Sequence, residues 1–266
     1  MSVPVPSDTS TDFVDTDWSA WLETASGQYL LSWEQSISDD RVSDIFGFNA
    51  FQCGTPALEG LRANRMPLRR VVLSAPNANQ VSLFSQDLPV LTDQFEALPF
   101  ESQSVDLLIL PHVLEFSADP HQLLREVERV LRPEGRVIVF GLNPFSLWGA
   151  RHLLSSWWFS PKLPRQTKMI PLSRLRDWLK LLEIEFDRAS FGCYRPLSSS
   201  ESTLNRTGFF EVLGDRFWPV CGAVYCVTAV KRVAGMRLIG PTWKGKALRG
   251  KVVQVQGVRQ VAAKKV

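Results

Sequence analysis

The pattern of apolar and polar positions is clearest in the middle of the chain. Ser104–Leu110 is nearly all apolar, which is typical of a strand buried on both faces of a parallel sheet. Asp119-Pro120 then predicts a helix start, with Asp as N-cap and Pro in the first turn, and this helix runs to about Leu131. Arg136–Gly141 is the next predicted strand. Strand, helix and strand in this order indicate a right-handed parallel crossover and an α/β doubly wound fold.

This crossover makes a specific structural prediction. The two strands should be adjacent and parallel, with the helix over residues 120–131 crossing between them on one face of the sheet. We expect these strand residues to be buried: Val105, Leu107, Ile109, Val137 and Val139.

Weaker patterns extend the prediction in both directions. Helical periodicity begins at Trp18, and a second helix is expected over Ser38–Phe46, ended by Gly47. Further strands are expected at Phe48–Cys53, Val71–Leu73, Val81–Phe84, Ile184–Tyr194 and Ala223–Val230. Further helices are expected at Pro171–Leu182 and Gly208–Phe217, with a polar loop over residues 196–206.

Composition narrows the class of protein. The chain has 266 residues, of which 45% are hydrophobic and 21% charged, and this excludes disorder as its main state. No apolar run reaches the roughly 18 residues of a membrane span. The N-terminal residues are polar and acidic, unlike a signal peptide. Four cysteines without metal-ligand spacing predict free thiols in a reducing cytoplasm and no metal site.

Charge divides the chain into parts. From Lys231 onward there are ten basic residues and no acid, whereas the rest carries 20 basic and 27 acidic residues. We therefore expect a flexible leader over residues 1–17, a domain over 18–232 that includes N-terminal helices over 18–46, and a flexible basic tail over 233–266. Such a tail could attract nucleic acid through its charge, or serve only as a solubilising segment.

One block resembles a known family. Leu98–Gly141 reads LPFESQSVDLLILPHVLEFSADPHQLLREVERVLRPEGRVIVFG and is similar to the class I S-adenosylmethionine-dependent methyltransferases of type 11. The sequences Gly141–Pro144 and Ser146–Gly149 resemble a narrower bacterial branch, the YafS-like proteins. The resemblance implies a Rossmann-like, mostly parallel seven-stranded sheet. It also implies S-adenosylmethionine as cofactor and a small-molecule methyl acceptor, and it leaves the oligomeric state open.

The same resemblance implies a set of cofactor-binding residues. Gly54 follows the first strand and would hold the methionine end, Asp93 or Gln94 would lie by the adenine, and Pro111 and His112 would form the floor. The family's glycine-rich turn keeps only one glycine in this sequence. The carboxylate with which the family binds the ribose has no counterpart here. A catalytically idle methyltransferase fold, used for binding or as a scaffold, is therefore the rival interpretation.

Substrate and catalytic residues are predicted at the ends of the two central strands. His112 is the candidate general base, because imidazole titrates near neutral pH, but it could equally cap the strand end. Glu115 could orient a substrate amine or be a solvated acid, and Asn143 could contact a polar substrate group or shape a turn. Trp148 belongs to an aromatic segment, residues 145–159, for which three roles stay open: a lid over the acceptor, core packing, or contact with a membrane surface aided by Arg151 and Lys162.

Overall fold

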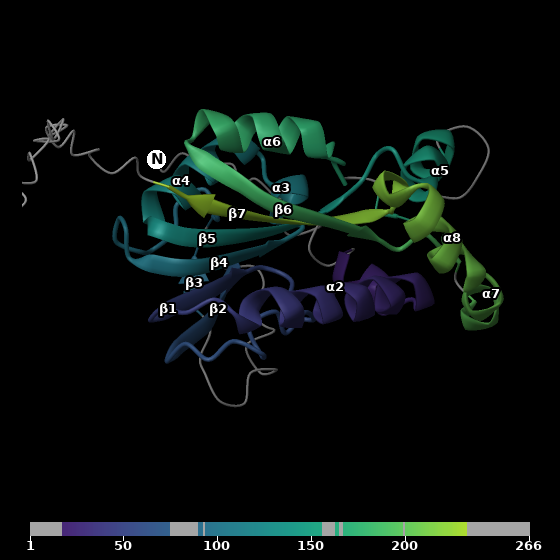
Figure 1. Cartoon of the computed structure of the whole chain (residues 1–266), viewed down its shortest axis with the longest axis horizontal. Coiled ribbons are helices and arrows are strands. Elements are labelled where there is room, and N and C mark those ends of the chain that lie inside the picture. The colour runs from purple at the N-terminus through teal and green to yellow at the C-terminus, as the bar shows by residue number, and fades with distance from the viewer. Residues whose placement is uncertain are drawn as a thin grey trace, which may run out of the picture. The chain divides into compact units, whose positions relative to one another are not determined.

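The computed structural model describes residues 18–74, 90–92, 94–155, 163–164, 167–198 and 200–232 (Figure 1). The chain divides into two units, residues 1–233 and 234–266, and every described residue belongs to the first. The predicted leader, the predicted strand at residues 81–84 and the basic tail beyond Arg232 lie outside the described residues. No helix in the described part of the chain is long and apolar enough to cross a bilayer.

The described strands form one seven-stranded sheet in the order β3-β2-β1-β4-β5-β7-β6. Their bounds are β1 Asn49–Cys53, β2 Leu68–Ser74, β3 Val90–Thr92, β4 Val105–Pro111, β5 Leu131–Leu142, β6 Ile184–Gly192 and β7 Val224–Lys231. The first five strands are parallel, and β7 runs antiparallel to both of its neighbours. The predicted Rossmann-like, mostly parallel sheet is therefore confirmed.

The strand order reverses between β1 and β4. The chain runs outward from β1 through β2 to β3 and then returns to place β4 on the other side of β1. Parallel sheets bind ligands at the carboxyl ends of the strands that flank such a reversal. The fold therefore directs attention to the residues that follow Cys53 and Pro111.

Each face of the sheet is covered by helices (Figure 1). On one face α2 (Ala25–Ser43) packs over alternate strand residues such as Leu107 and Ile109. On the other, α4 (Pro120–Val130) and α6 (Leu172–Leu181) pack over Leu108 and Leu110. Strand β4 is therefore buried on both sides, as its unbroken apolar sequence predicts.

The predicted crossover is present. Strand β4 pairs in parallel with β5 through contacts such as Leu108 with Val137, and α4 connects them. Asp119 caps α4 by accepting hydrogen bonds from the backbone N–H groups of His121 and Gln122, both at 3.0 Å. The five residues predicted to be buried are each at most 1% exposed.

The connection from β1 to β2 contains no helix. Residues 54–67 form turns and coil, and their polar groups bond to α2 and to the end of β1. The Asn64 side-chain amide donates to the Val42 and Ile45 carbonyls at 2.8 and 3.0 Å, which satisfies the carboxyl end of α2. Because these carbonyls are satisfied there, α2 ends at Ser43 rather than at the predicted Phe46.

Several other boundaries differ from the predictions. Gly47 is not a helix cap: a Cβ on it would lie 2.5 Å from the Asp106 Cβ, so close approach to β4 requires glycine there. The predicted polar loop over 196–206 contains α7 (Glu201–Arg206), which the buried Leu204 anchors. Sequence patterns also missed β3 and two helices, α3 (Val113–Phe116) and α5 (Leu147–Ser155). The predicted helix before β7 is α8 (Phe209–Phe217), followed by the short η2 (Pro219–Cys221).

Candidate active site

The carboxyl ends of β1 and β4 meet at the reversal of strand order. Gly54 follows β1 with a φ of +68°, and the Thr55 hydroxyl donates to the Pro111 carbonyl across the gap at 3.1 Å. A Cβ on Gly54 would lie 3.2 Å from the Val113 side chain. The backbone conformation and the close neighbour both favour glycine at this position.

Gln52 occupies the interior of the turn that follows β1. Its amide donates to the Thr55 and Leu58 carbonyls at 3.0 and 2.7 Å and accepts from the Gly60 N–H at 2.9 Å. Phe51 points to the opposite face of the sheet, where its ring packs on Phe100 with centroids 4.1 Å apart. The turn is therefore organised by hydrogen bonds from a buried side chain, in place of further glycines.

His112 lies directly after β4 in the left-handed conformation, with φ of 59°, and is fully buried. Its Nε2 is 2.6 Å from the Glu34 Oε1, and its Nδ1 is 2.8 Å from the Glu115 Oε2. Burial alone lowers the pKa of His112, but the two carboxylates outweigh it and raise that pKa to about 10. The imidazole is therefore a buried cation held between two acids at neutral pH.

Glu115 connects this cluster to the neighbouring strand. Its Oε1 accepts a hydrogen bond from the Leu142 N–H at the end of β5, while its Oε2 contacts His112. The side chain is 1% exposed. Glu115 thus connects β4 and β5 from a buried position. It is not the solvated acid that the sequence analysis considered.

Glu34 and Trp18 bring unpartnered polar atoms to the same place. Among the described residues, neither the Glu34 Oε2 nor the Trp18 Nε1 has a hydrogen-bond partner, although both atoms are buried. The Trp18 ring lies against His112, with centroids 4.8 Å apart. Burial raises the pKa of Glu34, against the lowering effect of His112. A buried acceptor and a buried donor without partners are costly, and they mark a place where a ligand can bind.

Sequence reasoning missed both of these residues, although a signal for Glu34 existed. Leu30, Glu34, Ser38 and Val42 recur every four residues along α2 and are all buried. An acid within such a stripe is unusual unless it is paired. Recognition of α2 as one continuous helix would have placed Glu34 on its inner face.

The other predicted substrate residues use their polar groups inside the protein. The Asn143 amide donates to the Val220 and Gly222 carbonyls, both at 2.9 Å, and its oxygen accepts from the Phe145 N–H. The Trp148 Nε1 donates to the Arg195 carbonyl at 2.7 Å, and its ring is 1% exposed. Both residues order the loops at the carboxyl edge.

The residues predicted for the adenine are only partly described. Gln94 follows β3 and is exposed, and its backbone carbonyl accepts from the Thr92 hydroxyl at 2.9 Å. Asp93 lies outside the described residues. The structure thus brings Gly54, Pro111, His112 and Glu115 together at neighbouring strand ends. It also shows no group of histidine, cysteine and acidic side chains suited to a metal within the described ranges.

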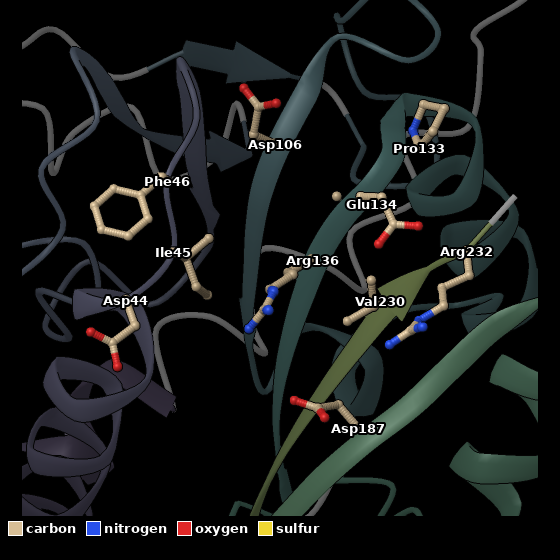
Figure 2. Close-up of a pocket in the computed structure, with 11 residues that line it drawn as sticks. Asp44, Ile45, Phe46, Asp106, Pro133, Glu134, Arg136, Asp187, Val230 and Arg232 are labelled. Atoms are coloured by element: carbon tan, nitrogen blue, oxygen red, sulfur yellow. The ribbon is translucent and has the colours of Figure 1, made fainter. Parts of the chain in front are cut away.

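A hollow of about 380 Å³ lies at the opposite edge of the sheet, where the parallel strands begin (Figure 2). Its lining mixes acids such as Asp106 and Asp187 with Arg136 and Arg232. Asp106 accepts hydrogen bonds from the backbone N–H groups of residues 48 and 49, and Arg232 pairs with Glu185 at 2.8 Å. Asp106 and Arg232 thus have structural partners, and the strand reversal places the candidate site at the other edge.

Comparison with known proteins agrees with the fold of the chain. The family model of the methyltransferase domain, type 11, matches residues 54–139, from the turn after β1 into β5. Residues 54–139 are therefore similar to a type 11 methyltransferase domain. The methyltransferase match includes Gly54, His112 and Glu115, whereas Glu34 and Trp18 precede it.

Individual relatives cover parts of the chain. YafS of Escherichia coli K12 is 39% identical over 117 residues, 42% of this chain and 47% of YafS. The ubiquinone/menaquinone biosynthesis C-methyltransferase UbiE of Hahella chejuensis is 33% identical over 82 residues, 27% of this chain and 33% of UbiE. The chain therefore spans less than half the length of either relative. A solved S-adenosylmethionine-dependent methyltransferase of Thermotoga maritima has the same fold, with a TM-score of 0.55 at 12% identity over 83% of this chain and 98% of that one.

Proposed function

We propose that the protein is a cytoplasmic S-adenosylmethionine-dependent methyltransferase that acts on a small-molecule acceptor. The observation that carries this proposal is the buried Glu34–His112–Glu115 cluster at the strand reversal of a type 11 methyltransferase domain. Four free cysteines, three of them buried, agree with a reducing compartment.

The residues at the carboxyl edge fit the charged end of this cofactor, which carries an ammonium, a carboxylate and a sulfonium. The Glu34 Oε2 is a buried acceptor, and the Trp18 Nε1 is a buried donor. Neither atom has a hydrogen-bond partner among the described residues. We assign the ammonium to Glu34 and the carboxylate to Trp18. Gly54 would allow the cofactor to approach the backbone of the turn. Pro111, His112 and Gln94, with Asp93 beside it, remain proposed cofactor residues.

When bound, the cofactor supplies an electrophilic methyl group. The chain's own residues would contribute alignment and exclusion of water. His112 has both ring nitrogens engaged, so we propose that it acts by positioning Glu34, with its own orientation set by Glu115. Asn143 and Trp148 would shape the acceptor side by ordering its loops. Binding of nucleic acid through the basic tail remains a prediction.

A second candidate, the catalytically idle fold, is favoured by the turn after β1. Gln52 and Pro56 stand where the family has glycines, and the Gln52 amide bonds within the turn. Loss of the ribose carboxylate removes hydrogen bonds to a charged group, which contribute about 1.5–3 kcal/mol. Cofactor affinity should then be roughly ten- to a hundredfold below that of a complete site.

Titration calorimetry with S-adenosylmethionine and S-adenosylhomocysteine separates the two candidates. We expect dissociation constants of roughly tens to hundreds of micromolar for the intact protein. Trp18→Phe keeps the ring and removes the donor, and should weaken binding about tenfold. Trp218→Phe is the matched control, because that ring is 62% exposed, and should leave binding unchanged.

The outcomes are distinct. If no heat of binding is detected at millimolar ligand, the catalytically idle fold becomes the better interpretation. Equal affinities for the intact protein and Trp18→Phe would remove Trp18 from the site while leaving the methyltransferase proposal standing.

A further inference from the structure

The space that Gly54 leaves open is taken up by two other side chains. A Cβ built on Gly54 would lie 3.2 Å from the Val113 Cγ2 atom, and 3.7 and 3.9 Å from the Cζ and Cε2 atoms of Phe95. The last two distances are ordinary van der Waals contacts, so the Phe95 ring packs against the face of the turn on which glycine has no side chain. The opening that a glycine provides at this strand end is therefore filled from within the protein.

Phe95 lies on a turn after β3 whose backbone is held by hydrogen bonds. The Ala97 N–H donates to the Gln94 carbonyl at 3.3 Å, which closes a β-turn around Phe95. The Thr92 hydroxyl lies 2.9 Å from the Gln94 carbonyl and 3.1 Å from the Ala97 carbonyl, and so ties the turn to the end of β3. With the backbone fixed in this way, the Phe95 ring moves by rotation about its own side-chain bonds.

Of the two side chains that contact this face of Gly54, Phe95 is the more easily displaced. Val113 is 6% exposed and belongs to the core on the side of the sheet that α4 covers. Phe95 is half-buried and packs against the edge of the same core. Because a half-buried ring already contacts water, it loses less apolar burial on turning outward than a core side chain does. Rotation of Phe95 alone would free the face of the turn.

We propose that Phe95 competes with the cofactor for this face of the turn and thereby lowers the affinity of the site. The proposal rests on the proposed function, because it takes the carboxyl ends of β1 and β4 as the place where the cofactor binds. A ligand that contacts Gly54 where the side chain is missing needs the volume that the Phe95 ring occupies, so the ring must turn away first. The observed affinity is then reduced by the fraction of molecules in which the ring is turned away. A smaller side chain at this position should strengthen binding.

Calorimetric titration of the full chain with S-adenosylhomocysteine tests the competition. We expect the dissociation constant to fall in Phe95→Leu and further in Phe95→Ala, by about tenfold in total, as for a ring that is turned away in about one molecule in ten. Phe46→Ala is the matched control, because that ring is 79% exposed beside the hollow at the opposite edge of the sheet, and should leave the dissociation constant unchanged. Urea unfolding identifies the variants that fold, and Phe95→Leu carries the test if Phe95→Ala does not.

The possible results separate this proposal from the proposed function. If the Phe95 variants bind the ligand only as tightly as the intact protein, the ring does not compete, and if they bind it more weakly, the ring contributes to the bound state. Either result overturns the competition while the proposed function stands. If neither the intact protein nor the variants bind at millimolar ligand, the proposed function fails and the competition with it. Binding by Phe95→Ala alone would support both.

Discussion

Replacing Glu34 with glutamine should destabilise the fold and change how its stability depends on pH. The substitution keeps an oxygen that can accept from the His112 Nε2 but removes one of the two charges beside this buried imidazolium. Removal of one partner from a buried ion pair typically costs about 3–5 kcal/mol. Because the glutamine oxygen can still accept a hydrogen bond from His112, the loss in the free energy of unfolding should be near the lower end of that range at pH 7.

The sign of the pH dependence follows from the direction of the pKa change. The pKa of His112 is raised from 6.5 to about 10 in the folded protein, so its stabilisation is fully present below pH 6.5 and is lost as pH rises toward 10. At about 1.4 kcal/mol per pH unit, the whole interval corresponds to about 5 kcal/mol at most. Between pH 7 and pH 9 the free energy of unfolding should therefore fall by roughly 2–3 kcal/mol.

Urea unfolding at pH 7 and pH 9 measures both effects. The intact protein should lose stability across this interval, and Glu34→Gln should start lower and lose less, because its imidazole is less firmly protonated. Glu59→Gln, at an exposed position, is the control and should follow the intact protein. A free energy of unfolding that is constant from pH 7 to pH 9, or an equal slope for Glu34→Gln, would refute the assignment of a buried cation to His112.

Three further substitutions test the local structure by urea or thermal unfolding. Gln52→Ala leaves the Thr55 and Leu58 carbonyls and the buried Gly60 N–H without this partner and should cost about 3 kcal/mol; a loss below 1 kcal/mol would show that the turn does not depend on this amide. Asp119→Ala removes the cap of α4 and should cost about 1 kcal/mol, and no change would contradict the capping role. Gly141→Ala places a Cβ 2.4 Å from the Tyr225 hydroxyl and should cost about 1–3 kcal/mol unless the ring can shift.

The crossover could be predicted from the sequence because its signals are local. Asp119-Pro120 determines where α4 begins, and the apolar run before it fits only a strand buried on both faces. The end of α2 could not be predicted in this way. Its last carbonyls are satisfied by Asn64, some twenty residues away in the sequence, and Gly47 is required by Asp106 on another strand. Contacts between distant residues override local propensity at both positions.

The candidate site, like the fold, could be predicted from the sequence only in part. His112 and Glu115 lie on the strand end that the crossover defines, so their proximity to the reversal of strand order followed from the sequence. Their partner Glu34 comes from a helix that precedes the sheet, and nothing local to His112 indicates it. The pairing decides the chemistry: an imidazole alone is a candidate base, whereas one between two carboxylates is a cation.

The turn after β1 and the N-terminal helices can be understood together. A glycine-rich turn binds a cofactor through exposed backbone, but here Gln52 uses backbone groups of that turn for its own hydrogen bonds. Within the described part of the chain, polar atoms without hydrogen-bond partners are found instead on Trp18 and Glu34, which pack over the end of β4. If the site binds its cofactor, recognition has shifted from backbone to side chains. Single substitutions such as Trp18→Phe should then affect cofactor affinity more than they would in a relative that keeps its glycines.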